Sequence, residues 1–181
     1  MKFSLFNNLV FFIILVIFTI KFMEPEALEY IDGYRSSSKY YFKGNVNIIL
    51  SAPHGGNLFP DDVPDRTDGI VMRSSSVNNE LQGQLRCKTT VVKDSATAEF
   101  TENVVKELMS KWNFRPFIII GKWHRRKVDF NRDILEGTLN HPEAIRAYEN
   151  YHQNVNDAID RVNQLFHKGL LIDIHGHSQG K

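Results

Sequence analysis

Three short runs of apolar, largely β-branched residues alternate with two long amphipathic segments in this sequence. The runs are residues 45–51, 116–120 and 170–174, whose length and composition predict buried β-strands. Between them, residues 94–112 and 142–167 carry apolar side chains three and four positions apart, which is the spacing of a helix with one buried face. Strands that alternate with helices typically form a parallel sheet covered by helices. We therefore expect an α/β fold with a mainly parallel or mixed sheet flanked by helices.

The first 23 residues form a separate segment with the properties of a membrane-directing signal. Residues 9–20 are almost entirely apolar, with a lysine before and after them. This length suits the apolar core of a signal peptide, whereas a membrane-spanning helix needs about 20 residues. We expect a hydrophobic helix within residues 1–23 that acts as a signal peptide or as a membrane anchor, so that the protein is secreted or membrane-anchored. Residues 24–44 are expected to be a linker to a domain at residues 45–181.

The charge balance argues against a nucleic-acid partner. The 181 residues include 22 basic and 21 acidic ones, which gives a net charge of +1, whereas nucleic-acid-binding domains typically carry a basic surface. With 42% hydrophobic residues, the chain is large enough to bury a core of its own. Its single cysteine, Cys87, has no partner for an intramolecular disulfide, and we interpret it as a buried thiol.

A histidine follows each of two predicted strands. His54 lies in the sequence Ala-Pro-His-Gly-Gly directly after the first strand, and His175 follows the third. Ligands of open α/β sheets bind beyond the carboxyl ends of the strands. A single histidine in such a place is usually structural, but imidazole nitrogen is also a frequent zinc ligand. Because two histidines occupy matching strand ends, we expect His54 and His175 to share a metal site.

A dense polar block, residues 122–132, follows the strand predicted at residues 116–120. It includes Arg125, Asn131 and Arg132. A solvated basic loop is one interpretation of such a block. Guanidinium groups also bind carboxylates through paired hydrogen bonds, so these three residues are candidates for binding a small carboxylate-bearing substrate.

The residues after the third strand allow a second interpretation of the site. Gly-His-Ser-Gln-Gly at residues 176–180 matches the G-x-S-x-G pattern of serine hydrolases, with Ser178 as the nucleophile. That turn needs a helix directly after the serine, and the other catalytic residues normally follow it in the chain. Only three residues follow Ser178 in this sequence, so we favour the metal site.

Five short motifs follow one another along the chain. They are Ser-Ala-Pro-His-Gly-Gly at 51–56, Asp-x-x-Thr at 94–97, His-Arg-x-x-Val-Asp-x-Asn-Arg at 124–132, Tyr-His at 151–152 and Ile-Asp-Ile-His-Gly at 172–176. Together these motifs, which cover roughly residues 45–178, resemble the N-formylglutamate amidohydrolase-like proteins, a family related in fold to the zinc carboxypeptidases. The resemblance implies a zinc-dependent hydrolase that cleaves an amide next to a carboxylate.

The resemblance also implies roles for individual residues. His54 and His175 match the histidine ligands of the zinc ion. Asn131 and Arg132 match the pair that holds the substrate carboxylate, and Arg125 is placed to polarise the scissile carbonyl.

Two positions depart from the pattern of this family. The carboxylate ligand expected three residues after the first histidine is replaced by Asn57, so we assign Asp94 as the third ligand. The general-base glutamate expected on a later strand is missing, which leaves His177 as the candidate catalytic base. Asp173 is expected on the opposite face of its strand from His175. Because the sequence stops soon after this strand, we expect an incomplete domain, and a non-catalytic binding module is the alternative to an active hydrolase.

Overall fold

A computed structural model of the protein describes residues 27–66, 71–72, 86–87 and 90–176. Its elements in chain order are β1 (Ile31–Asp32), the 3-10 helix η1 (Tyr34–Ser36), β2 (Ser38–Tyr41), β3 (Ile48–Ala52), β4 (Val71–Met72), β5 (Arg86–Cys87), α2 (Thr97–Trp112), β6 (Phe117–Gly121), α3 (Ile134–Thr138), α4 (Pro142–Phe166) and β7 (Leu170–Asp173). A five-stranded sheet with the order β1-β2-β6-β3-β7 forms the centre, and β4 and β5 pair separately.

The three strands predicted from the apolar runs lie side by side in this sheet. β3 pairs in parallel with β6 on one side and with β7 on the other. Ser51 is level with Ile119 of β6 and with Asp173 of β7, so the carboxyl ends of all three strands lie at the same end of the sheet. β2 is antiparallel to β6, which makes the sheet mixed. The predicted α/β class is confirmed.

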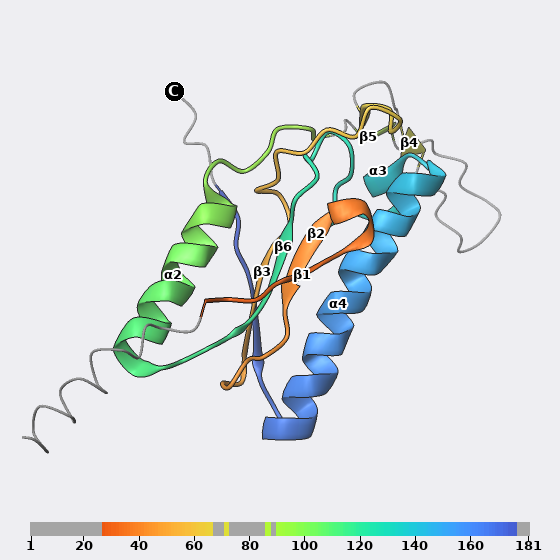
Figure 1. Cartoon of the computed structure of the whole chain (residues 1–181). Coiled ribbons are helices and arrows are strands. Elements are labelled where there is room, and N and C mark those ends of the chain that lie inside the picture. Colours follow the sequence, from red (N-terminus) through yellow and green to blue (C-terminus); the bar gives the residue numbers. More distant parts are fainter. Residues whose placement is uncertain (1–26, 67–70, 73–85, 88–89, 177–181) are drawn as a thin grey trace, which may run out of the picture.

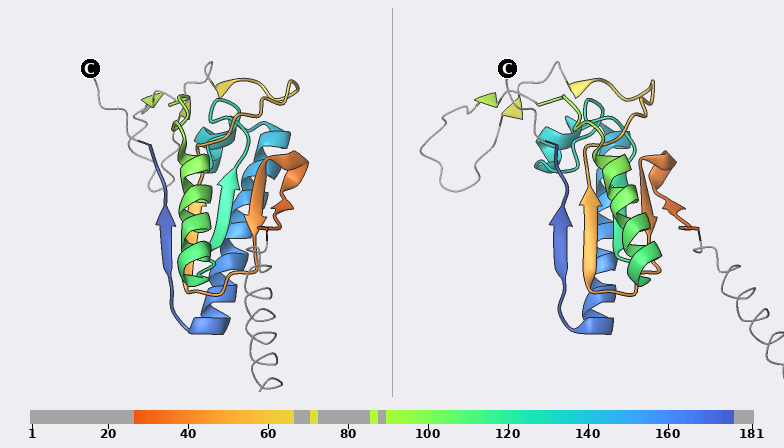
Figure 2. Two further views of the ribbon diagram at one scale, coloured as in Figure 1. Left: turned by 60° about the vertical axis from the view of Figure 1, so that its left-hand side comes forward. Right: turned by 90° about the vertical axis from the view of Figure 1, so that its left-hand side faces the viewer.

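The two long helices cover opposite faces of the sheet (Figure 1, Figure 2). Consecutive residues of β3 show this, because Ile49 packs in the core on the α4 side and Leu50 in the core on the α2 side. The chain runs from β3 through α2 to β6, and then through α4 back past β3 to β7. Right-handed crossovers in opposite directions require helices on opposite faces. The carboxyl ends of β3 and β6 are then the switch point at which open α/β sheets bind ligands.

Both amphipathic segments form the predicted helices, α2 and α4. α2 begins at Thr97, three residues later than expected. The backbone of Ala96, directly before it, is left-handed with φ of 60°, and this turns the preceding segment away from the helix axis. Asp94 therefore lies in an irregular segment just before the helix.

The segment expected to be a linker is part of the sheet. Within residues 24–44, β1 and β2 extend the sheet beyond β6. Tyr40 and Tyr41 are 7% and 4% exposed and enter the cores on opposite faces. Because both faces of β2 are covered, its residues do not alternate between apolar and polar, and the periodicity of the sequence gave no strand signal.

The apolar sequence of the last strand, β7, predicts that it is buried, but the structure shows it exposed. β7 lies at the edge of the sheet (Figure 2), and Leu170, Leu171 and Ile172 are 56%, 45% and 38% exposed. Among the described residues, β7 pairs with β3 alone. A continuous apolar run of this kind is typical of a strand with a neighbour on each side.

The hydrophobic helix predicted within residues 1–23 lies outside the described residues. In the part of the chain that the structure describes, no helix is both long enough and apolar enough to span a membrane.

Candidate metal centre

The loop after β3 places His54 at the carboxyl end of the strand, where the side chain is 1% exposed. The two glycines that follow it pack closely against neighbouring backbone. A β-carbon at Gly55 would lie 2.6 Å from the amide nitrogen of Ala98 in α2, and one at Gly56 would lie 2.4 Å from the carbonyl oxygen of Lys122. Glycine at both positions therefore lets the loop pass between α2 and the end of β6, which holds His54 in place.

Asp94 lies between the two histidines that were predicted to share a metal. Its Oδ2 atom is 3.3 Å from Nδ1 of His54 and 3.1 Å from Nδ1 of His175. Gly176 donates a backbone hydrogen bond of 3.1 Å to the same oxygen. The centroids of the two imidazole rings are 5.1 Å apart. The structure thus brings together the three residues predicted as metal ligands.

These three side chains could hold a metal ion. One potential ligand atom from each lies within 4.8 Å of the others. Two imidazole nitrogens and one carboxylate oxygen are a set that zinc accepts in catalytic sites, with a fourth position left for water or substrate. The second ring nitrogen of His54 is engaged by an aspartate, so its Nδ1 atom is the one available to a metal. The residues present therefore fit the zinc ion that the sequence suggested.

A buried aspartate behind His54 was not predicted as part of the site. Oδ1 of Asp129, which is 0% exposed, lies 2.6 Å from Nε2 of His54. Its other oxygen accepts a 2.8 Å hydrogen bond from Nε of Arg125 and lies 3.4 Å from Nη1 of Arg66. A carboxylate that accepts the second N–H of a histidine ligand fixes the orientation and the tautomer of the ring. The signal available in the sequence was the place of Asp129 inside the motif at residues 124–132.

Asp94 and Asp129 are both held in the ionised form by their neighbours. Burial opposes ionisation of Asp129, but the contact with His54 and the guanidinium of Arg125 outweigh it, so its pKa lies well below the usual value. Burial also opposes ionisation of Asp94, but the hydrogen bond from Gly176 and the contacts with the two histidines hold its pKa below the usual value. Both carboxylates are therefore anionic at neutral pH, and for Asp94 this is the form that a metal ligand requires.

His175 has two polar neighbours besides Asp94. Its Nε2 atom lies 3.1 Å from Oδ2 of Asp173 and 3.0 Å from the side-chain amide nitrogen of Asn131. The expectation that Asp173 points away from His175 is wrong, because residues two apart in a strand face the same side of the sheet. Asp173 is placed to support the ring of His175 as Asp129 supports that of His54.

The three residues predicted to bind a substrate carboxylate occupy different environments. Arg125 is buried, and its Nη1 atom lies 3.5 Å from Oδ1 of Asp94. Asn131 contacts a histidine of the metal cluster. The side chain of Arg132 is 41% exposed, and its Nε atom lies 3.5 Å from Oε1 of Glu136. Arg125 and Asn131 thus adjoin the cluster, whereas Arg132 lies at its margin.

A pocket of about 320 Å³ opens directly beside the cluster. Asp94, Arg125 and Gly176 form part of its wall, and the other lining residues are Thr90, Val92, Lys93 and Ser95. A pocket of this volume suits a small molecule. Its lining carries two basic side chains, Lys93 and Arg125, beside the carboxylate of Asp94.

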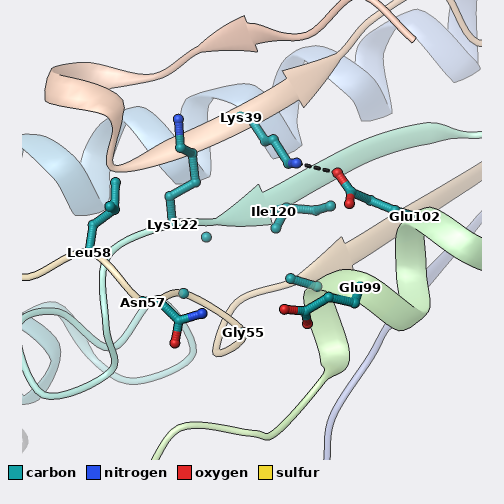
Figure 3. A pocket seen from close by; sticks show the side chains of 11 residues that line it. Lys39, Gly55, Asn57, Leu58, Glu99, Glu102, Ile120 and Lys122 are labelled. Carbon is teal, nitrogen blue, oxygen red and sulfur yellow. Dashed lines mark hydrogen bonds and ion pairs between the residues drawn. The ribbon is translucent and has the colours of Figure 1, made fainter. Parts of the chain in front are cut away.

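A second pocket, of about 200 Å³, lies between the first turns of α2 and the end of β6 (Figure 3). Glu99 and Glu102 line it, and Glu102 forms an ion pair with Lys39. Asn57, at the position where the sequence resemblance implied a carboxylate ligand, lines the same pocket and accepts a hydrogen bond from Lys93. The described group of possible metal ligands, His54, Asp94 and His175, includes neither glutamate.

The predicted base His177 and the alternative nucleophile Ser178 lie outside the described residues. Their roles stay predictions from the sequence.

Comparison with known proteins finds no matching family model, no matching curated protein and no matching solved structure. The function is therefore argued from the chemistry of the site.

Proposed function

We propose that the protein is a zinc-dependent hydrolase that cleaves an amide bond in a small carboxylate-bearing compound. The observation that carries this proposal is the convergence of His54, Asp94 and His175 beside a pocket with basic side chains. The order of the sequence motifs resembles that of the N-formylglutamate amidohydrolase-like proteins. N-formylglutamate, or another small N-acyl amino acid, is accordingly the substrate to test first.

The ligand atoms follow from the hydrogen bonds of the two imidazoles. His54 and His175 would bind through Nδ1, because their Nε2 atoms face Asp129 and Asp173. Asp94 adds the negative charge that two neutral imidazoles lack. Zinc held there supplies Lewis-acid polarisation of a carbonyl and lowers the pKa of water to about 7.

Arg125 is the residue best placed to orient a substrate in the neighbouring pocket. Its guanidinium is fixed by the 2.8 Å hydrogen bond to Asp129, and it lines the pocket next to Asp94. A donor that is already oriented loses little entropy when it binds a carbonyl or carboxylate oxygen. The proton released by the attacking water needs a base, and the proposal keeps His177 in this role because Gly176, directly before it, borders the pocket.

The test is zinc binding and formate release by the purified full-length protein. We expect one zinc ion per chain, lost in His54→Ala, and release of formate from N-formyl-L-glutamate that depends on zinc and on His177. Zinc binding without release, but with affinity for N-formylglutamate, would identify the non-catalytic binding module instead. Release that persists without zinc and disappears in Ser178→Ala would favour the serine hydrolase. Failure to bind any divalent metal would refute the proposal.

A further inference from the structure

Lys93 contacts both pockets beside the metal cluster and has no role in the proposed function. It lines the larger pocket, of about 320 Å³, together with Asp94 and Arg125. Its ammonium group donates a hydrogen bond to Oδ1 of Asn57, which lines the second pocket. Lys93 thus links the wall of the larger pocket to the loop that carries His54.

The partner of Lys93 is neutral, unlike the partners of two other lysines nearby. Lys39 and Lys122 line the second pocket; Lys39 forms an ion pair with Glu102 (Figure 3), and Lys122 forms one with Asp32. No carboxylate among the described residues forms an ion pair with Lys93. A carboxylate is a stronger partner for an ammonium group than a neutral amide oxygen is, because both members of the pair are then charged. An anionic ligand can therefore displace this amide from the lysine.

Arg125, the other basic residue in the lining of the larger pocket, already has carboxylate partners. Its Nε atom donates a 2.8 Å hydrogen bond to Asp129, and its Nη1 atom lies 3.5 Å from Oδ1 of Asp94. Arg132 contacts Glu136 and is not among the residues that line this pocket. Of the two basic side chains in the described lining, the lysine is thus the one without a carboxylate partner.

We propose that Lys93 binds a carboxylate group of the ligand in the larger pocket, and that Asn57 holds the lysine while this pocket is empty. The identity of the ligand rests on the proposed function, but the contact itself does not. Lysine carries its charge on a flexible stem with three rotatable donors, so the ammonium group can turn from Asn57 to a ligand without movement of the backbone. Because Lys93 directly precedes Asp94, a carboxylate bound in this way lies close to the metal cluster.

Lys93 and Arg132 then bind different carboxylates. Arg132 lies at the margin of the cluster and Lys93 lines the pocket, so a small compound with two carboxylates can contact both. Arg125, whose charge is balanced by its aspartate partners, is left to orient the carbonyl of the scissile amide.

Glutarate is a suitable probe, because this dicarboxylate has no amide bond and binds without being hydrolysed. Calorimetric titration of the full-length protein, with and without added zinc, measures its dissociation constant. We expect this constant to rise about tenfold, which is about 1.4 kcal/mol, in Lys93→Met under both conditions. Lys93→Arg should recover most of the affinity, because the guanidinium keeps the charge. Lys122→Met is the matched control and should bind glutarate as the wild type does, because Lys122 already has an ion pair.

Two substitutions of Asn57 test the exchange of partners. Asn57→Asp supplies a carboxylate that holds Lys93 in an ion pair, so glutarate should bind about as weakly as it does to Lys93→Met. Asn57→Ala removes the competing partner, so the affinity should not fall. A lysine that only stabilised the loop would give the opposite order, because Asn57→Ala would loosen the site and Asn57→Asp would strengthen it.

The thermal unfolding midpoint of each variant checks that the fold is kept. Equal glutarate affinity in Lys93→Met and Lys122→Met would overturn the proposal, and so would a wild-type protein that binds no glutarate. Glutarate affinity that depends on Lys93 in a protein that binds no zinc would contradict the hydrolase function and leave the lysine contact established.

Discussion

Nε2 of His54 lies 2.6 Å from Oδ1 of Asp129, and both side chains are almost completely buried. The same carboxylate accepts a hydrogen bond from Arg125 and lies 3.4 Å from Nη1 of Arg66. One buried charge therefore orients a candidate metal ligand and balances two guanidinium groups. Metal affinity and stability should for this reason depend on the same residue.

Replacing Asp129 with asparagine should affect both properties. We expect Asp129→Asn to weaken zinc binding about 10- to 100-fold, because the His54 ring loses the group that orients it. The free energy of unfolding should fall by roughly 3–5 kcal/mol, because buried guanidinium groups lose their counter-charge. Calorimetric titration and urea unfolding measure the two effects. Adding Arg66→Met should recover part of the stability and none of the zinc affinity, and wild-type zinc affinity in Asp129→Asn would contradict this assignment.

The choice between Asp94 and Asn57 as the third ligand can be tested with a matched pair of variants. Asp94→Asn should lower zinc affinity about tenfold or more, at least about 1.4 kcal/mol, because a neutral amide replaces an anionic ligand. Asn57→Ala should leave the affinity unchanged, since Asn57 lines the second pocket. Competition with a chelating dye measures both. A loss of zinc affinity in Asn57→Ala would show that residue 57 contributes to the metal site.

Arg132 is predicted to hold the substrate carboxylate without touching the metal. We expect Arg132→Ala to weaken binding of an N-acyl glutamate by roughly 1.5 kcal/mol, the low end for a charge-assisted contact, because the side chain is 41% exposed. Zinc affinity should not change. Arg126→Ala removes a neighbouring arginine of similar exposure, 44%, and serves as the control. Equal substrate affinity in the two variants would show that Arg132 does not bind the substrate carboxylate.

His152 should make the fold less stable in mildly acidic solution. Burial lowers the pKa of His152 below its usual value, and the ring packs against Tyr148 with centroids 4.2 Å apart. As the pH falls below about 6.5, the unfolded chain binds a proton on this imidazole before the folded chain does, so the free energy of unfolding decreases. Urea unfolding across this range should show a shallower decrease in His152→Gln than in the wild type. His167→Gln removes an exposed imidazole and is the control. The wild-type slope in His152→Gln would contradict the lowered pKa of this half-buried ring.

The N-terminal segment should direct the protein to membranes. Deleting residues 1–23 removes the apolar run at residues 9–20, and we expect the shortened protein in the soluble fraction of expressing cells. The full-length protein should sediment with membranes or enter the secretory pathway. Cell fractionation with protease protection distinguishes these locations, and full-length protein found wholly in the cytosol would refute the prediction.

The parts of the fold that were predicted correctly have a local signal. β6 is buried along its whole length, so its sequence is one continuous apolar run, and α4 keeps an apolar side chain every three or four positions. β2 has no such signal, because Ser38 is buried beside Tyr40 and Tyr41 and the strand is short. The exposure of β7 also has no local signal, since the sequence of a strand does not state how many neighbours it has.

Some residues of the candidate site could likewise be predicted from the sequence, and others could not. His54 and His175 were predictable because each directly follows an apolar strand and is followed by glycine. Asp129 stands inside the motif at residues 124–132, but its role depends on contact with a residue 75 positions away, which the motif does not report. Asp173 was misjudged although the pleat of the strand fixes its direction relative to His175.

The pairing of β7 with β3 has a consequence for the order in which the protein folds. β3, α2 and β6 can assemble while the chain is still being synthesised. The contact between Asp94 and His175 forms only later, because His175 lies 81 positions further along the chain. Closing a loop of that length precedes any gain from strand contacts, so docking of β7 is expected to be a slow step. A metal ion that needs both histidines binds only chains that have completed this step, and it then holds them there. The rate of metal uptake during refolding should therefore follow the docking of β7 and not the formation of the earlier strands.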